Sequence, residues 1–249
     1  MKGSKLAVII TAPRPRSGAT LLARAFADYF RLSREHPLIF DTGHDERRLS
    51  LYFPGMATAV DLNNIRGQMT LFDTLASPVD EKRVVDVSHE SFAHFFDVME
   101  KIDYLGEAHA QRVEPVIFYI LGRAVDSYEQ ARVLRDRFAC PFVVVDNPFV
   151  GGPNEKARHS QGHAALLLHP WRMRMPPLDP LMADVIADTG LSLGAFMRED
   201  VHSSSLAFLS REARPAIRAW IMAMFREIHR ILRALEGRPQ LLRVAGDLP

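Results

Sequence analysis

The sequence predicts an α/β fold in which a mostly parallel sheet has helices on both faces. In the first half of the chain, short apolar runs alternate with stretches of helical periodicity, and this alternation is typical of parallel sheets with crossover helices. The short runs are rich in β-branched and aromatic residues and almost unbroken in apolarity, as expected for strands buried on both faces. We therefore expect three layers: helices, sheet and helices.

Five segments are predicted to be strands of this sheet. They are residues 6–11, 37–41, 83–87, 116–121 and 142–145. Between them, residues 20–32, a segment around 91–104 and residues 127–138 have the pattern of helices. The last of these carries apolar residues at spacings of three and four with charges on the opposite side, which predicts a crossover helix. These apolar residues are Tyr128, Ala131, Leu134 and Phe138.

The pattern changes after residue 147. Residues 148–162 are rich in Gly, Pro and charge and are predicted to be a loop. Of the two apolar runs that follow, 164–168 and 171–176, we expect the second to supply a further strand, because Met175-Pro176 ends it sharply. Residues 214–235 carry one apolar stripe and are predicted to form a long closing helix. The sequence has neither repeats nor a low-complexity linker, so residues 1–249 are predicted to form one domain with this helix packed on it.

The composition limits the classes of partner. The 249 residues are 47% hydrophobic, enough to bury a full core. Charged residues make up 24% of the chain and the formal net charge is +1, so the composition supports contact with neither DNA nor a membrane. Cys140 is the single cysteine, and residues 1–11 contain only a short apolar run, far below the roughly 20 residues that a spanning helix needs. A soluble protein in the cytoplasm is expected.

The first predicted strand leads through a loop into a helix that begins near Gly18. This order directs backbone N–H groups and the positive end of the helix dipole at any anion in the loop, and Thr20 can offer its hydroxyl to a phosphate or a magnesium ion. A standard P-loop reads G-x-x-x-x-G-K-[ST]. Gly18 and Thr20 match its end, whereas Ala19 replaces the lysine and Ala12 or Pro13 the opening glycine.

Two arginines stand in this loop. A guanidinium binds phosphate with two hydrogen bonds, so Arg14 and Arg16 are the candidates to replace the missing lysine. The alternative interpretation is an ordinary turn from strand to helix whose arginines are solvated.

Acidic residues follow two of the predicted strands. Asp41 and Asp45 follow the second strand, and Asp86 lies at the end of the third. In an open α/β sheet, ligands bind at the carboxyl edge of the strands, so these acids are predicted to face the loop across a crevice. A carboxylate there can hold a metal ion directly or through water.

With these features the chain resembles the ParA/MinD group of P-loop ATPases, including its plasmid-transfer members, over residues 5–176. The family loop reads K-G-G-x-G-K-T. Its early lysine, which reaches the nucleotide of the partner subunit, falls at Arg14, and its glycines fall at Pro15 and Arg16. Asp86 matches the aspartate that ends the third motif strand of the family, and Asp41 or Asp45 matches the acids of its first switch.

The resemblance implies a nucleotide-dependent switch that positions or recruits a protein partner, and it implies a homodimer. ATP or ADP with Mg²⁺ would be the cofactors. Asp41, Asp45 and Asp86 would be the catalytic acids, and Thr20 and Asp86 would hold the metal. The nucleotide would contact Arg14, Arg16, Ser17, Gly18, Ala19, Thr20 and Leu21.

The resemblance extends to the expected base-binding region. The segment 142–151 resembles the family strand that ends in an asparagine contacting adenine, which would be Asn147. Pro176 resembles the proline that packs beside the base. The alternative interpretations are an Asn-Pro turn and a proline that ends a strand. Because both family lysines are absent, the protein is expected to be at most a slow ATPase.

Two other functions fit parts of the chain. The string Pro15-Arg-Ser-Gly-Ala-Thr-Leu-Leu resembles the phosphosulfate loop of sulfotransferases, P-R-S-G-T-T-L-L, which implies a transferase. The second alternative is an interaction scaffold without nucleotide, because arginines flank the apolar stripe of the closing helix and could meet an acidic partner or anionic lipid. We expect instead that this helix packs on the sheet, since Trp220 and Phe225 suit a core.

Overall fold

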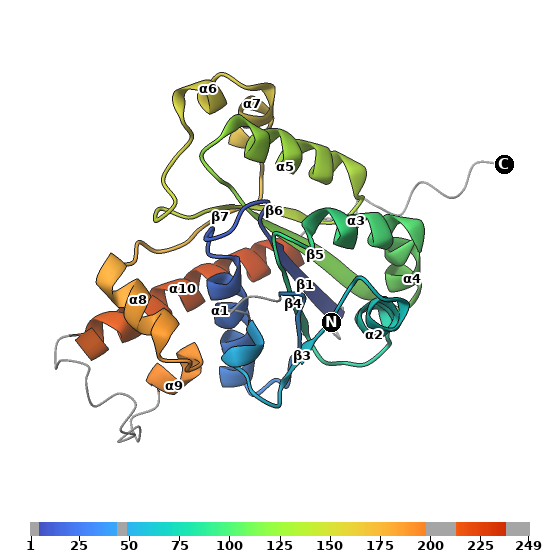
Figure 1. Ribbon diagram of the computed structural model, residues 1–249, viewed down its shortest axis with the longest axis horizontal. Coiled ribbons are helices and arrows are strands. Elements are labelled where there is room, and N and C mark those ends of the chain that lie inside the picture. The colour runs from blue at the N-terminus through green and yellow to red at the C-terminus, as the bar shows by residue number, and fades with distance from the viewer. Residues whose placement is uncertain (1–4, 44–48, 198–212, 238–249) are drawn as a thin grey trace.

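The computed structural model describes residues 5–43, 49–197 and 213–237 of the chain. Within them lies a sheet of seven parallel strands in the order β3-β2-β4-β1-β5-β6-β7, with helices on both faces (Figure 1). The predicted α/β class is confirmed. The strands are β1 (Lys5–Thr11), β2 (Leu38–Asp41), β3 (Ala57–Ala59), β4 (Arg83–Val87), β5 (Val113–Ile120), β6 (Phe142–Asp146) and β7 (Arg172–Arg174).

Each face of the sheet has its own hydrophobic core. One face, here the α1 face, is covered by α1 (Ala19–Leu32), the short helix η1 (Leu49–Leu51), α8 (Pro180–Asp188), α9 (Leu193–Met197) and α10 (Ala213–Glu236). The opposite face, here the α5 face, is covered by α2 (Ile65–Ala76), α3 (Phe92–Lys101), α4 (Tyr104–Ala110), α5 (Val125–Arg137), α6 (Glu155–Arg158) and α7 (Gln161–Leu167).

The central strand β1 shows why the predicted strands are continuously apolar. Val8 and Ile10 enter the core of the α1 face, whereas Ala7 and Ile9 enter the core of the α5 face. Successive side chains of a strand point to opposite faces, so a strand covered on both sides is apolar along most of its length. The five predicted strands are present, and the run 171–176 contains β7 as expected.

One sequence prediction was wrong, and several elements were not predicted. The segment 148–162 is not all loop: it contains α6, whose first turn is capped by the Asn154 side chain accepting from the Ala157 N–H at 2.8 Å, and the start of α7. The helix predicted around 91–104 is present as α3, which ends at Lys101; Asp103, with a left-handed φ of 49°, separates it from a further helix, α4, that was not predicted. The strand β3 and the helices α2, α8 and α9 were not predicted.

The closing helix α10 packs on the α1 face. Its apolar stripe is buried from Ile217 to Leu235, and Trp220 Nε1 donates a hydrogen bond to the Pro176 carbonyl at 3.0 Å. Arg230 donates to the Arg172 carbonyl at 2.7 Å and so ties the helix to β7. None of the helices in the described part of the chain has the length and apolarity needed to cross a membrane.

A buried polar network holds α8 and α9 against α1. Arg24 donates to the carbonyls of Ile186 at 3.1 Å and Leu191 at 2.6 Å. Burial lowers the pKa of Arg24 to about 10, which leaves it charged at neutral pH. Asp28 accepts from the Gly194 N–H at 2.8 Å, and burial raises the pKa of its carboxyl. Because charged groups are costly to bury without such partners, this network fixes where the segment after β7 lies.

Candidate functional site

The loop between β1 and α1 lies at the carboxyl edge of the sheet. Arg16 (φ 57°) and Gly18 (φ 93°) both have left-handed backbone conformations, and α1 has no side-chain cap at its first turn. Among the described residues, no group accepts a hydrogen bond from the backbone N–H of residues 17–21. Left-handed residues alternating with ordinary ones make successive N–H groups converge into an anion-binding hollow. The loop therefore has the backbone arrangement that binds phosphate.

Asn147 fixes this loop from the end of β6. Its side-chain Nδ2 donates to the Ser17 carbonyl at 2.8 Å, and its Oδ1 accepts from the Phe149 N–H at 3.1 Å. A Cβ atom on Gly18 would lie 2.6 Å from Asn147 Nδ2, so both the backbone conformation and the close approach require glycine. Both ends of the amide are engaged within the protein. Its expected contact with adenine stays a prediction and would require one of these bonds to be exchanged.

Pro176 lies near the same loop. It follows β7, and the side chain of the preceding residue, Met175, lies 3.7 Å from the position of a Cβ on Gly18. The carbonyl of Pro176 accepts the indole N–H of Trp220, as described above. The ends of β6 and β7 thus flank the loop, on the side where the resemblance expects a base.

The arginines of the loop lie at its rim. Arg14 forms an ion pair with Asp126, at the start of α5, and their side chains are 59% and 46% exposed. Arg16 is exposed. At the position of the missing lysine, Ala19 offers no charge. The sequence did not indicate the partnership with Asp126, because the two residues are far apart in the chain and no motif connects them.

Asp41 and Asp86 lie side by side at the ends of neighbouring strands. They are register partners across β2 and β4, and they are 1% and 4% exposed. Ile39 and Val84, two residues earlier on each strand, enter the core of the α1 face. Because strand side chains alternate, both carboxylates point to that same face. The structure thus brings two of the three predicted acids together on the side of the sheet that carries α1.

Two observations about the predicted acids do not match a simple metal site. Asp45 lies outside the described residues. Asp41 accepts hydrogen bonds from the N–H groups of Gly43 at 2.8 Å and Ser50 at 2.6 Å, so both oxygens of its carboxylate already have partners within the protein. The described part of the chain contains no group of three or more His, Cys, Asp or Glu residues that could hold a metal ion.

The oxygen donors for a metal are therefore few. Thr20 lies in the first turn of α1, and Asp86 is the second-last residue of β4, which neighbours β1. Mg²⁺ keeps several waters and is usually bound through one or two protein oxygens together with phosphates. The residues present fit a magnesium ion carried by a nucleotide, and they do not form a metal cage of their own.

Comparisons with known proteins add little to this picture. No protein-family model matches the chain, and no curated protein matches it in sequence. Among solved structures, the MinC:MinD cell division protein complex of Aquifex aeolicus is similar at 13% identity and a TM-score of 0.43, covering 94% of this chain and 97% of that chain. A likeness this distant decides neither family nor function. The fold defines a three-layer α/β protein, and the loop between β1 and α1 is an uncapped helix start at the carboxyl edge of its sheet.

Proposed function

We propose that the loop between β1 and α1 binds the phosphates of ATP or ADP, and that the chain acts as a ParA/MinD-like switch with very slow turnover or none. The observation that carries this proposal is the uncapped start of α1. There, the backbone N–H groups of residues 17–21 have no acceptor among the described residues, and Arg16 and Gly18 turn the loop into a hollow. Such N–H groups favour an anion whatever the side chains are.

The arginines can add charge at small cost. The pair of Arg14 with Asp126 is largely exposed, and exposed ion pairs contribute about 0–1 kcal/mol. Exchange of Asp126 for a phosphate oxygen is therefore almost neutral for Arg14. Arg14 also stands where the resemblance places the lysine that reaches the nucleotide of a partner subunit, so the same exchange would accompany formation of a homodimer.

Thr20 and Asp86 are the residues that would hold a magnesium ion arriving with the nucleotide. When bound, the ion would neutralise part of the negative charge on the phosphates. Asp41 would act as a positioning residue, because its carboxylate accepts from the backbone N–H groups of Gly43 and Ser50.

Slow turnover follows from Ala19. Phosphoryl transfer depends on positive charge placed beside the transferred group, and loss of one such stabilising group costs about 100- to 1,000-fold in rate. The loop contains two prolines, Pro13 and Pro15, which have no N–H to donate. Both features leave binding possible and weaken catalysis. Robust magnesium-dependent phosphate release would contradict this part of the proposal.

The test of binding introduces charge at the start of α1. Ala19→Glu places a carboxylate beside the expected phosphates, where like charges repel. A glutamate in the first turn of a helix favours folding, so the variant should remain folded. Ala19→Gln is the matched control, with nearly the same size and no charge. By calorimetry, Ala19→Glu should lower ATP and ADP affinity by at least about tenfold relative to Ala19→Gln. Equal affinity in the two variants would exclude the loop from the site.

The second candidate is a sulfotransferase-like enzyme. It is favoured by the string from Pro15 to Leu22, which carries arginine and no lysine. Adenosine 3′,5′-bisphosphate discriminates between the two, because such an enzyme binds a 3′-phosphorylated donor whereas a switch prefers ATP or ADP. If the wild-type protein binds none of these nucleotides, the interaction scaffold is the remaining function.

A further inference from the structure

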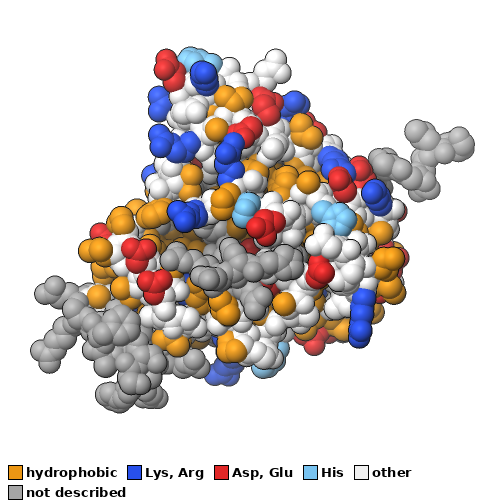
Figure 2. Space-filling model, in the orientation of Figure 1, with side chains coloured by type: hydrophobic (Ala, Val, Ile, Leu, Met, Phe, Trp, Pro, Cys, Tyr) orange, Lys and Arg blue, Asp and Glu red, His pale blue; other side chains and the backbone are white. Residues whose placement is uncertain are grey.

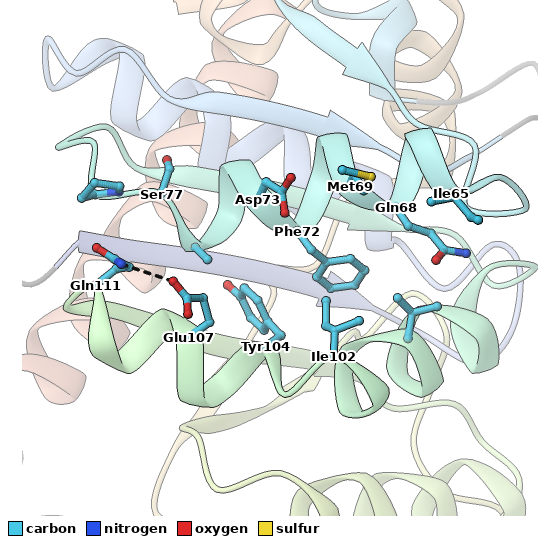
Figure 3. Close-up of a pocket in the computed structure, with 13 residues that line it drawn as sticks. Ile65, Gln68, Met69, Phe72, Asp73, Ser77, Ile102, Tyr104, Glu107 and Gln111 are labelled. Carbon is cyan, nitrogen blue, oxygen red and sulfur yellow. Dashed lines mark hydrogen bonds between the residues drawn. The ribbon is translucent and has the colours of Figure 1, made fainter.

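A groove on the α5 face, remote from the loop, has the features of a binding site. It runs between α2 and α4, has a volume of about 580 Å³ and receives side chains from both helices (Figure 3). Phe72 reaches into it from α2, and Tyr104 rises from α4 toward α2. Two helices lying side by side with a channel between them match the surface that an amphipathic helix occupies in other proteins.

One end of the groove is apolar and exposed. Ile65 and Met69 on α2 are 74% and 57% exposed, and Ile102, between α3 and α4, is 50% exposed. Hydrophobic side chains accordingly form part of the surface over α2 (Figure 2). Single exposed apolar side chains are common on protein surfaces, whereas several such side chains gathered at one hollow are typical of a binding site. Removing the apolar surface at this end of the groove from water would stabilise a complex.

The other end of the groove is polar and acidic. Asp73 on α2 and Glu107 on α4 stand on opposite walls, and the lining contains no Lys or Arg (Figure 3). The hydroxyl of Tyr104, a residue only 1% exposed, has no hydrogen-bond partner among the described groups. A buried polar group without a partner is uncommon in proteins, and here it lies in the lining of the cavity.

We propose that this groove binds an amphipathic helix of a partner protein, with apolar residues over Ile65, Met69 and Ile102 and Lys or Arg facing Asp73 and Glu107. The spacing fits: from Ile65 to Asp73 a helix rises about 12 Å, which matches the two turns covered by partner residues i, i+3, i+4 and i+7. The two carboxylates repel an anionic lipid surface. The proposal is independent of nucleotide binding.

The test uses the full chain without nucleotide and two synthetic helical peptides. Both carry leucine at i, i+3, i+4 and i+7; one has lysines flanking the leucines and the other has glutamates at the same positions. Fluorescence anisotropy of the labelled peptides should show binding of the lysine peptide and much weaker binding of the glutamate peptide. Asp73→Lys leaves one positive and one negative charge in the groove and should abolish this preference, whereas Asp73→Asn should only weaken it. Equal binding of both peptides to the wild-type protein would overturn the charge argument.

The apolar end is tested with a matched pair of surface leucine and methionine changes. Met69→Asn should weaken binding of the lysine peptide by about tenfold or more, as loss of a central apolar contact does. Leu181→Asn on α8, which is 76% exposed and outside the groove, should leave binding unchanged. Equal loss in the two variants, or no loss in either, would refute the site. Binding of phosphatidylglycerol vesicles that Met69→Asn abolishes would assign the groove to a membrane and overturn the proposal as well.

Discussion

Substitution of Gly18 by alanine tests the coupling between the loop and the end of β6. The residue has φ 93° and ψ 15°, and an added Cβ would lie 2.6 Å from Asn147 Nδ2. The matched control is Gly190→Ala, because Gly190 is also left-handed, with φ 62°, yet has nothing within 4 Å of its Cβ position. Both glycines are left-handed, so both carry a backbone penalty, and only Gly18 has a side chain close to the added Cβ.

The expected losses of stability follow from the left-handed backbone and from the contact with Asn147. An alanine held in a left-handed conformation costs about 1–2 kcal/mol, which is the whole expected effect of Gly190→Ala. In Gly18→Ala the Asn147 amide must also move away from the Ser17 carbonyl, which loses a hydrogen bond of about 1 kcal/mol. The free energy of unfolding should therefore fall by about 2–3 kcal/mol in Gly18→Ala.

Urea unfolding of four proteins measures the coupling: the wild type, Gly18→Ala, Asn147→Ala and the double variant. In the Asn147→Ala background, Gly18→Ala should cost only the backbone penalty, so the coupling free energy should be about 1 kcal/mol. Strict additivity of the two changes, or an equal cost for Gly18→Ala and Gly190→Ala, would show that Asn147 does not constrain the loop as the distances indicate.

Two further predictions concern the closing helix and pH. Trp220→Ala removes a buried ring and its hydrogen bond, so it should lower the free energy of unfolding by about 3–5 kcal/mol. The control Met222→Ala, on the exposed side of α10, should change the free energy of unfolding by less than about 1 kcal/mol. Equal effects of the two substitutions would show that α10 is not part of the core. Burial lowers the pKa of His169 below its usual value, so the unfolded chain binds more protons below about pH 6.5 and the folded protein loses stability as pH falls from there. His169→Gln should show a smaller loss than the wild type in urea unfolding at pH 7 and pH 5.5; an identical loss would contradict this assignment.

The regular part of the fold was predictable because its causes are local. The strand from Lys5 to Thr11 is apolar at every core position since both faces are covered, and α10 shows its stripe directly in the sequence. The failures have local causes as well. β3 is three residues long at the edge of the sheet, and two of the three are exposed, so it carries no apolar pattern. The break at Asp103 depends on one left-handed residue within an otherwise helical sequence.

At the site, the sequence by itself determined the turn. The strand, the loop that ends in Gly18 and the helix that begins at Ala19 follow one another along the chain, so the geometry of the turn follows from local backbone preferences. Tertiary structure decided what surrounds the turn. Arg14 meets Asp126 across 112 positions and Asn147 reaches the Ser17 carbonyl across 130 positions, while Asp41 and Asp86 became neighbours through the register of β2 and β4. These contacts form because of the order of the parallel strands in the sheet. Local sequence patterns do not specify that order.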